Sequence, residues 1–124
     1  MSDNDLKVII KAKELMKHTY LLTSNSNRYP KKYRHSLVDR MQITSMDILK
    51  TLRKANRINN VANKVLRCET ITEAIGCCDD LLDYIELSME LKLINDKSTA
   101  YWSKMVSDVK HMAIAWRTSE RKQK

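Results

Sequence analysis

Apolar residues recur every three or four positions along most of the chain, which is the spacing that places them on one face of an α-helix. The clearest stripe steps by four, three, four, four and three residues and consists of Leu37, Met41, Thr44, Ile48, Leu52 and Ala55. A second stripe steps by four, four, three and four residues and consists of Tyr101, Met105, Val109, Met112 and Trp116. Each stripe predicts an amphipathic helix whose apolar side faces a shared core.

Two further apolar faces are less regular. Near the start of the chain the inner face is expected at Leu6, Ile9, Ile10, Met16 and Tyr20, with Ala12 near its edge. Between residues 61 and 94 it is expected at Val65, Ile71, Ala74, Ile75, Cys78, Leu81, Leu82, Ile85 and Met89. Met46 and Trp102 fall outside these faces. Both are therefore expected on the surface, where contact between subunits would bury them.

The 124 residues include one glycine and one proline, whereas a sheet protein of this length would need several Gly- or Pro-rich turns. We therefore expect one all-α domain spanning 1–124, folded as an antiparallel up-down-up-down four-helix bundle with short connections. Pro30 suits the first position of a helix, and Asn95-Asp96 is a turn and cap. The helices are expected at about 4–22, 30–56, 61–94 and 97–117, followed by a polar, basic tail at 118–124 that is expected to fray.

Charge is strongly uneven along the chain. The net charge is +8, which favours nucleic acid or an acidic protein surface as a partner, although a merely soluble basic surface is the simpler alternative. Residues 1–67 carry 15 Lys and Arg against 5 Asp and Glu, whereas residues 68–100 carry 2 against 8. This separation predicts distinct basic and acidic faces, which could also meet one another in a ring of identical subunits.

Basic residues line the side of helix 30–56 that lies opposite its apolar stripe, and they continue into the next helix. Outward-facing Lys and Arg can follow a phosphate backbone without reading bases. The candidate residues for binding nucleic acid or a polymerase are Lys31, Lys32, Arg34, Arg40, Lys50, Arg53, Lys54, Arg57, Lys64 and Arg67. Tyr29 and Tyr33 lie among them and are candidates for stacking on unpaired bases. The alternatives are an ordinary solvated face and, for Tyr33, a place in the core.

No arrangement of residues indicates catalysis. A di-iron bundle needs Glu-x-x-His on two helices, and that motif is missing, as is a phosphate-binding glycine loop. His18, His35 and His111 lack the spacing of metal ligands, and the acids of 61–94 are expected on a solvated or interface face. We therefore expect no enzyme activity, catalytic residue, metal or cofactor.

The cellular setting is predicted from the cysteines and the chain start. Cys68, Cys77 and Cys78 form neither a disulfide framework nor a CxxC metal pair, so reduced thiols in a cytoplasm are the simplest interpretation. No apolar run approaches a membrane span, and the start of the chain is too acidic and polar for a signal peptide.

Three segments resemble one known family. Tyr29-Pro30-Lys31-Lys32-Tyr33-Arg34 with Leu37-Val38-Asp39-Arg40-Met41-Gln42 is similar to the start of the second helix in accessory variability determinant proteins of diversity-generating retroelements. Leu91-Lys92-Leu93-Ile94-Asn95 resembles the end of their third helix, and Tyr101 to Trp116 resembles their last. These proteins belong to a wider group of small four-helix proteins that includes the ribosomal-RNA intervening-sequence proteins. Relatives often have glycines before the final tryptophan, where this chain has Ile114-Ala115.

The resemblance implies a non-enzymatic, cytoplasmic accessory factor encoded by a bacterium or phage. It implies a homopentameric ring that binds a retroelement reverse transcriptase and its RNA or RNA–DNA hybrid, and so supports mutagenic cDNA synthesis. The basic residues of the second helix and the start of the third would hold nucleic acid or the polymerase. Two alternatives stay open: a ribosomal-RNA-associated protein of the intervening-sequence type, and a protein–protein scaffold that docks an acidic partner.

Overall fold

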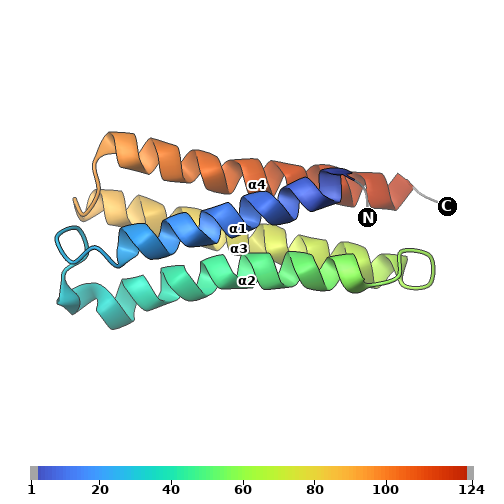
Figure 1. The fold of residues 1–124 in the computed structure, drawn as a ribbon, viewed down its shortest axis with the longest axis horizontal. Coiled ribbons are helices and arrows are strands. Elements are labelled where there is room, and N and C mark those ends of the chain that lie inside the picture. Colours follow the sequence, from blue (N-terminus) through green and yellow to red (C-terminus); the bar gives the residue numbers. More distant parts are fainter. Residues whose placement is uncertain (1–2, 123–124) are drawn as a thin grey trace.

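The computed structural model describes residues 3–122, which form four α-helices and no strand (Figure 1). The predicted all-α fold is thereby confirmed. The helices are α1 (Asp3–Thr23), α2 (Asp39–Arg57), α3 (Lys64–Glu90) and α4 (Asp96–Lys122). A 3₁₀ turn, η1 (Lys31–Tyr33), and a π turn, η2 (Arg34–Val38), precede α2. Within residues 3–122 no helix has the length and apolar character needed to cross a membrane.

Each helix packs along two neighbours. α2 contacts α1 and α3, and α4 also contacts α1 and α3, so that α1 and α3 lie across the bundle from each other. Figure 1 looks past α1 toward α3. The connectors 24–30 and 91–95 lie at one end of the bundle, and the loop 58–63 lies at the other end, where α1 begins and α4 ends (Figure 1).

The core follows the predicted stripe of α2 closely. Five of its six positions are buried: Leu37, Met41, Ile48, Leu52 and Ala55. The sixth, Thr44, is half-buried at the edge of the stripe. Each buried aliphatic side chain contributes roughly 1.5–3 kcal/mol against the loss of chain entropy. The opposite face of α2 is consequently held toward solvent.

The expected inner faces of α1 and α4 are correct only in part. The buried line of α1 consists of Val8, Ala12, Leu15 and Thr19, and that of α4 consists of Trp102, Val106, Val109, Ala113 and Trp116. Val109 and Trp116 are buried as expected, whereas Ile10 and Tyr101, also expected inside, are 47% and 61% exposed. Ile9, Met16, Met105 and Met112 are partly buried beside these lines. The side chain of Leu6 lies outside the described part of the structure.

Trp102, which is expected on the surface, is instead fully buried. Its indole Nε1 donates a hydrogen bond to Thr19 Oγ1 at 3.1 Å, and the Thr19 hydroxyl donates to the Leu15 carbonyl at 2.9 Å. A buried tryptophan needs an acceptor for its N–H, and a threonine on the inner face of α1 provides one. Trp102 therefore joins α1 to α4 and needs no contact with a second subunit.

The second and third helices also differ from their predicted bounds. Pro30, expected as the first helical residue, precedes the first turn with a ψ of 155°. The chain from Lys31 to Val38 is helical but irregular, and α2 proper begins at Asp39. α3 begins at Lys64 and ends at Glu90 rather than at residue 94, because Lys92 has a φ of 62°, a left-handed conformation that ends a helix. Of the residues expected in the core of α3, Val65 is 71% exposed and Met89 is also exposed.

The predicted fraying tail is wrong for the part that the structure describes. α4 continues through residues 118–122, and Glu120 in this segment is buried. Residues 123–124 of the predicted tail lie outside the described residues. The polar sequence hid this extension, because its single inward-facing side chain is charged and its partner, Arg67, lies on α3.

Candidate nucleic-acid interface

Four exposed cations form a ridge along the second half of α2. They project opposite Leu52 and Ala55, which face the core. The α2 ridge consists of Lys50, Arg53, Lys54 and Arg57. None of them makes an ion pair with another residue of the described range 3–122. Four uncompensated positive charges within two helical turns produce a local potential that attracts a polyanion.

The other cations predicted around the start of α2 form a separate group. Lys31, Lys32, Arg34 and Arg40 are all exposed. Arg40 precedes Lys50 by ten residues, which is about 15 Å along a helix. Lys32 Nζ lies 5.1 Å from the centre of the Tyr33 ring, a cation–π contact. The predicted residues thus form two clusters on α2 and its leading turns rather than one patch.

Arg67 does not belong to the interface. Its Nη2 lies 3.0 Å from Glu120 Oε1, its Nη1 donates to the Ile58 carbonyl at 2.8 Å, and its guanidinium carbon lies 5.1 Å from the centre of the Trp116 ring. Because the side chain is buried among these groups, it cannot reach a phosphate. Lys64 is half-buried and donates from Nζ to the Arg121 carbonyl at 3.0 Å, so it helps to hold the end of α4.

Tyr29 is likewise a core residue and cannot stack on a base. It is 4% exposed, and burial raises the pKa of its hydroxyl. Tyr33 is partly buried against the same core, and Lys32 covers one face of its ring. The alternative interpretation of Tyr33 as a core residue therefore describes it better than base stacking does.

A depression of about 510 Å³ separates the α2 ridge from α3. It is lined by the four ridge cations together with Asp47, Glu73, Thr51 and Cys77. Burial raises the pKa of the Cys77 thiol, and the negative charges of Asp47, Asp80 and Glu73 raise it further. Carboxylates of α2 and α3 therefore lie near this thiol, beside the cations that line the same depression.

The outer face of α3 carries the carboxylates that the sequence places there. Exposed acids consist of Glu69, Glu73, Asp79, Asp80, Asp83, Glu86 and Glu90. Asp79 Oδ1 accepts a hydrogen bond from Lys110 Nζ of α4 at 2.6 Å. The other six form no ion pair within residues 3–122. This acidic face lies across the bundle from α1, whose Lys7, Lys13 and Lys17 are exposed.

The lysines of α1 are the residues that the sequence alone did not assign to the interface. Lys13 and Lys17 are exposed and make no ion pair within the described residues, whereas Lys11 pairs with Glu14 at 3.5 Å. Helical periodicity could have indicated them. Once Val8, Ala12 and Leu15 are placed on the inner side of α1, the periodicity puts Lys13 and Lys17 together on its exposed side.

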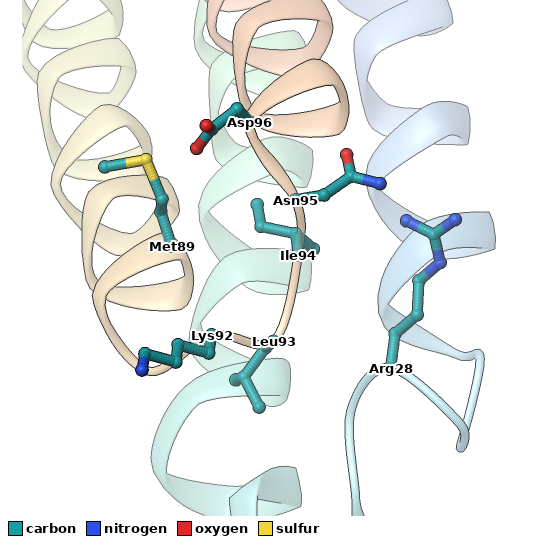
Figure 2. A pocket seen from close by; sticks show the side chains of 7 residues that line it. All are labelled: Arg28, Met89, Lys92, Leu93, Ile94, Asn95 and Asp96. Carbon is teal, nitrogen blue, oxygen red and sulfur yellow. The ribbon is translucent and has the colours of Figure 1, made fainter.

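A second depression, of about 530 Å³, lies where the connector 91–95 enters α4 (Figure 2). Arg28 and Lys92 supply its cations, and Asp96 supplies a carboxylate. Figure 2 shows Lys92 extending away from Arg28, whose Nη1 donates to Ser98 Oγ at 3.0 Å. The two cations do not converge, so the depression is not built to hold a phosphate group.

The remaining titratable groups lie apart from one another. Within residues 3–122 no three His, Cys, Asp or Glu side chains are grouped as metal ligands would be. His18 packs edge-on against Tyr101 and Trp102, and burial lowers its pKa. Burial raises the pKa of Cys78 to about 12, so that this thiol stays protonated at neutral pH.

Comparison of the chain with known protein families, with curated proteins and with solved structures gives no match.

Proposed function

We propose that this protein binds the phosphate backbone of RNA through the α2 ridge and has no bond chemistry of its own. The observation that carries the proposal is the absence of ion pairs for Lys50, Arg53, Lys54 and Arg57 within residues 3–122. Cations left without partners in the folded chain release counterions from a nucleic acid when they bind it. Such binding would position the nucleic acid without reading its sequence.

We further propose, from the family resemblance, the setting in which this binding operates. The chain would be an accessory factor of a diversity-generating retroelement that holds the reverse transcriptase together with its RNA or RNA–DNA hybrid. Its antiparallel bundle would assemble as a ring of five subunits in the cytoplasm. The similarity of residues 29–42, 91–95 and 101–116 to the accessory variability determinant proteins supports this proposal.

A protein partner is the second candidate, and one observation favours it. Ile43 and Met46 of α2 are exposed, two turns and one turn before Lys50 respectively. An exposed apolar strip beside cations suits an acidic protein surface better than a phosphate backbone, which offers nothing apolar to bury. The polymerase in the first proposal, or an acidic scaffold partner, could occupy it.

The deciding experiment is a tagged pull-down from the native host, with and without nuclease, analysed by mass spectrometry and RNA sequencing. The proposal expects a reverse transcriptase together with one dominant noncoding RNA. Recovery of ribosomal subunits would favour the intervening-sequence alternative. An acidic protein that survives nuclease, without RNA, would refute RNA binding and leave a scaffold. Light scattering tests the ring separately, because five 14.5 kDa subunits would give about 72 kDa.

A further inference from the structure

Two contacts fix how α1 and α2 lie against each other. The Tyr20 hydroxyl donates to Met46 Sδ at 2.7 Å, and Gln42 Nε2 donates to Thr23 Oγ1 at 3.0 Å. Connector 24–30 joins the two helices at the same end of the bundle (Figure 1). Moving away from that end, residue numbers therefore fall along α1 and rise along α2.

This register places cations of the two helices at matching heights. Lys17 is three residues from Tyr20, and Lys50 is four from Met46, so both lie about 5–6 Å beyond the Tyr20–Met46 contact. Lys13 and Arg53 are each seven residues away, about 10 Å beyond it. The cations form two successive pairs, one from each helix, and Arg57 continues the series on α2.

The cations of these pairs lie on the exposed face that α1 and α2 form together. Tyr20 contacts Met46 of α2, and Lys13 lies two helical turns farther from connector 24–30, on the same side of α1 as Tyr20. Arg53 lies two turns beyond Met46 on the same side of α2, and it also lines the depression toward α3. All four side chains are exposed, and none has an ion pair within residues 3–122.

The opposite flank of the α2 ridge is less favourable for phosphates. The depression between α2 and α3 contains Asp47 and Glu73, and the outer face of α3 adds further carboxylates. A phosphate backbone placed there would meet cations and anions together. On the α1 flank the four cations of the two pairs are exposed, and Glu14, the acid of α1 next to Lys13, pairs with Lys11.

We propose that RNA lies along the exposed face formed by α1 and α2 (the α1–α2 face), with Lys13 and Lys17 of α1 contacting its phosphates beside Arg53 and Lys50 of α2. This inference rests on the proposed RNA binding and extends it, since it adds a second helix to the site and assigns the RNA to one flank of the ridge. Lys54, which faces α3, contributes less than Arg53.

The test compares two double variants that remove equal charge. Lys13→Gln/Lys17→Gln alters the α1–α2 face. Lys97→Gln/Lys104→Gln removes two exposed lysines from α4 and serves as the matched control. Binding of a fluorescent single-stranded RNA of mixed sequence is measured by anisotropy from low to high salt, and circular dichroism verifies that both variants keep their helices.

We expect the Lys13→Gln/Lys17→Gln variant to bind about 5- to 20-fold more weakly near physiological salt, with its salt slope reduced by about 1.4, since each lost single-strand phosphate contact lowers the slope by about 0.7. The control should differ from the unaltered protein by less than twofold. An equal loss in both variants would overturn the inference, because the effect would then follow net charge and not position.

Crosslinking separates failure of this inference from failure of the proposed function. Ultraviolet crosslinking of the same RNA to the unaltered protein, followed by peptide mass spectrometry, should label α1 and α2 and spare α3. If RNA crosslinks to α2 and α3 and binds the Lys13→Gln/Lys17→Gln variant as tightly as the unaltered protein, the proposed function stands and the α1–α2 face is refuted as the site. Absence of any saturable, salt-dependent binding by the unaltered protein refutes both.

Discussion

Nη2 of Arg67 lies 3.0 Å from Oε1 of Glu120, and both side chains are less than one-tenth exposed. The same oxygen accepts a hydrogen bond from Trp116 Nε1 at 3.1 Å, and the second amino group of Arg67 holds the carbonyl of Ile58. One ion pair thus joins α3, the last turns of α4 and the loop after α2. It explains why a polar chain end remains helical.

Breaking this pair should strongly destabilise the protein. Glu120→Ala leaves a buried guanidinium without its carboxylate, and such losses are typically about 3–5 kcal/mol. Arg67→Met/Glu120→Leu removes both charges and should recover much of that loss. Urea denaturation followed by circular dichroism gives both free energies of unfolding. If the double variant is as unstable as Glu120→Ala, packing and not the unpaired charge is responsible.

Alanine substitutions at the adjacent residues Trp102 and Tyr101 should change the free energy of unfolding by very different amounts. Trp102→Ala removes a fully buried indole and should lower the free energy of unfolding by about 3–5 kcal/mol, whereas Tyr101→Ala alters an exposed side chain and should remain within about 0.5 kcal/mol. Trp102→Phe isolates the hydrogen bond to Thr19. Comparable effects at 101 and 102 would show that the face of α4 is assigned wrongly.

Gly76 should tolerate a methyl group. It lies within α3 on the exposed side, and a Cβ built on it meets no atom within 4 Å. Gly76→Ala is therefore expected to stabilise the subunit by up to about 1 kcal/mol through helix propensity alone. Thermal unfolding measures this. A lower midpoint would instead reveal a close neighbour at this position, supplied by another chain.

Alkaline pH should weaken the fold through Cys78. Its folded pKa is raised from 9.0 to about 12 by burial, so the folded protein holds the thiol proton more tightly than the unfolded chain does. That stabilisation is complete below about pH 9 and falls as the pH rises from 9 toward 12. Urea denaturation at pH 8 and pH 10.5 should show a larger loss of stability in the unaltered protein than in Cys78→Ala. Equal losses would mean that Cys78 does not contribute.

The α2 ridge should govern the salt dependence of RNA binding. Replacing Lys50, Arg53, Lys54 and Arg57 with Gln should reduce the slope of log affinity against log salt by up to about 3, while helix content is unchanged. A matched variant that loses Lys92, Lys97, Lys104 and Lys122 controls for net charge. An unchanged slope in the ridge variant would exclude the ridge from the interface.

The sequence predicts α2 best because its inner face is built from large aliphatic residues. Ile48 and Leu52 have no other environment that suits them, and their spacing defines the buried side. On α1 and α4 the same rule is less accurate. The buried lines there include Ala12, Thr19 and Ala113 as well as large residues, while Ile10 and Tyr101 are exposed beside them. Small or polar residues can be buried without altering a hydrophobic pattern.

The candidate nucleic-acid interface is only partly predictable from the sequence, for a similar reason. Outward cations on α2 follow directly from the position of its apolar stripe. Arg67 and Tyr29, in contrast, belong to types that usually keep a polar end in water, and only their three-dimensional partners show that they are buried. The pairing of Lys13 with Arg53 requires the register of two helices, and periodicity within one helix carries no information about register.

The charge arrangement of the bundle has a consequence before any contact forms. Cations on α1 and α2 and carboxylates on the outer face of α3 give the subunit a dipole moment directed across its long axis. In the field of a polyanion that dipole experiences a torque, which turns α3 away during the approach. The protein would then meet the polyanion already oriented. Raising the ionic strength would slow association, because salt removes this alignment and also weakens the attraction between the two molecules.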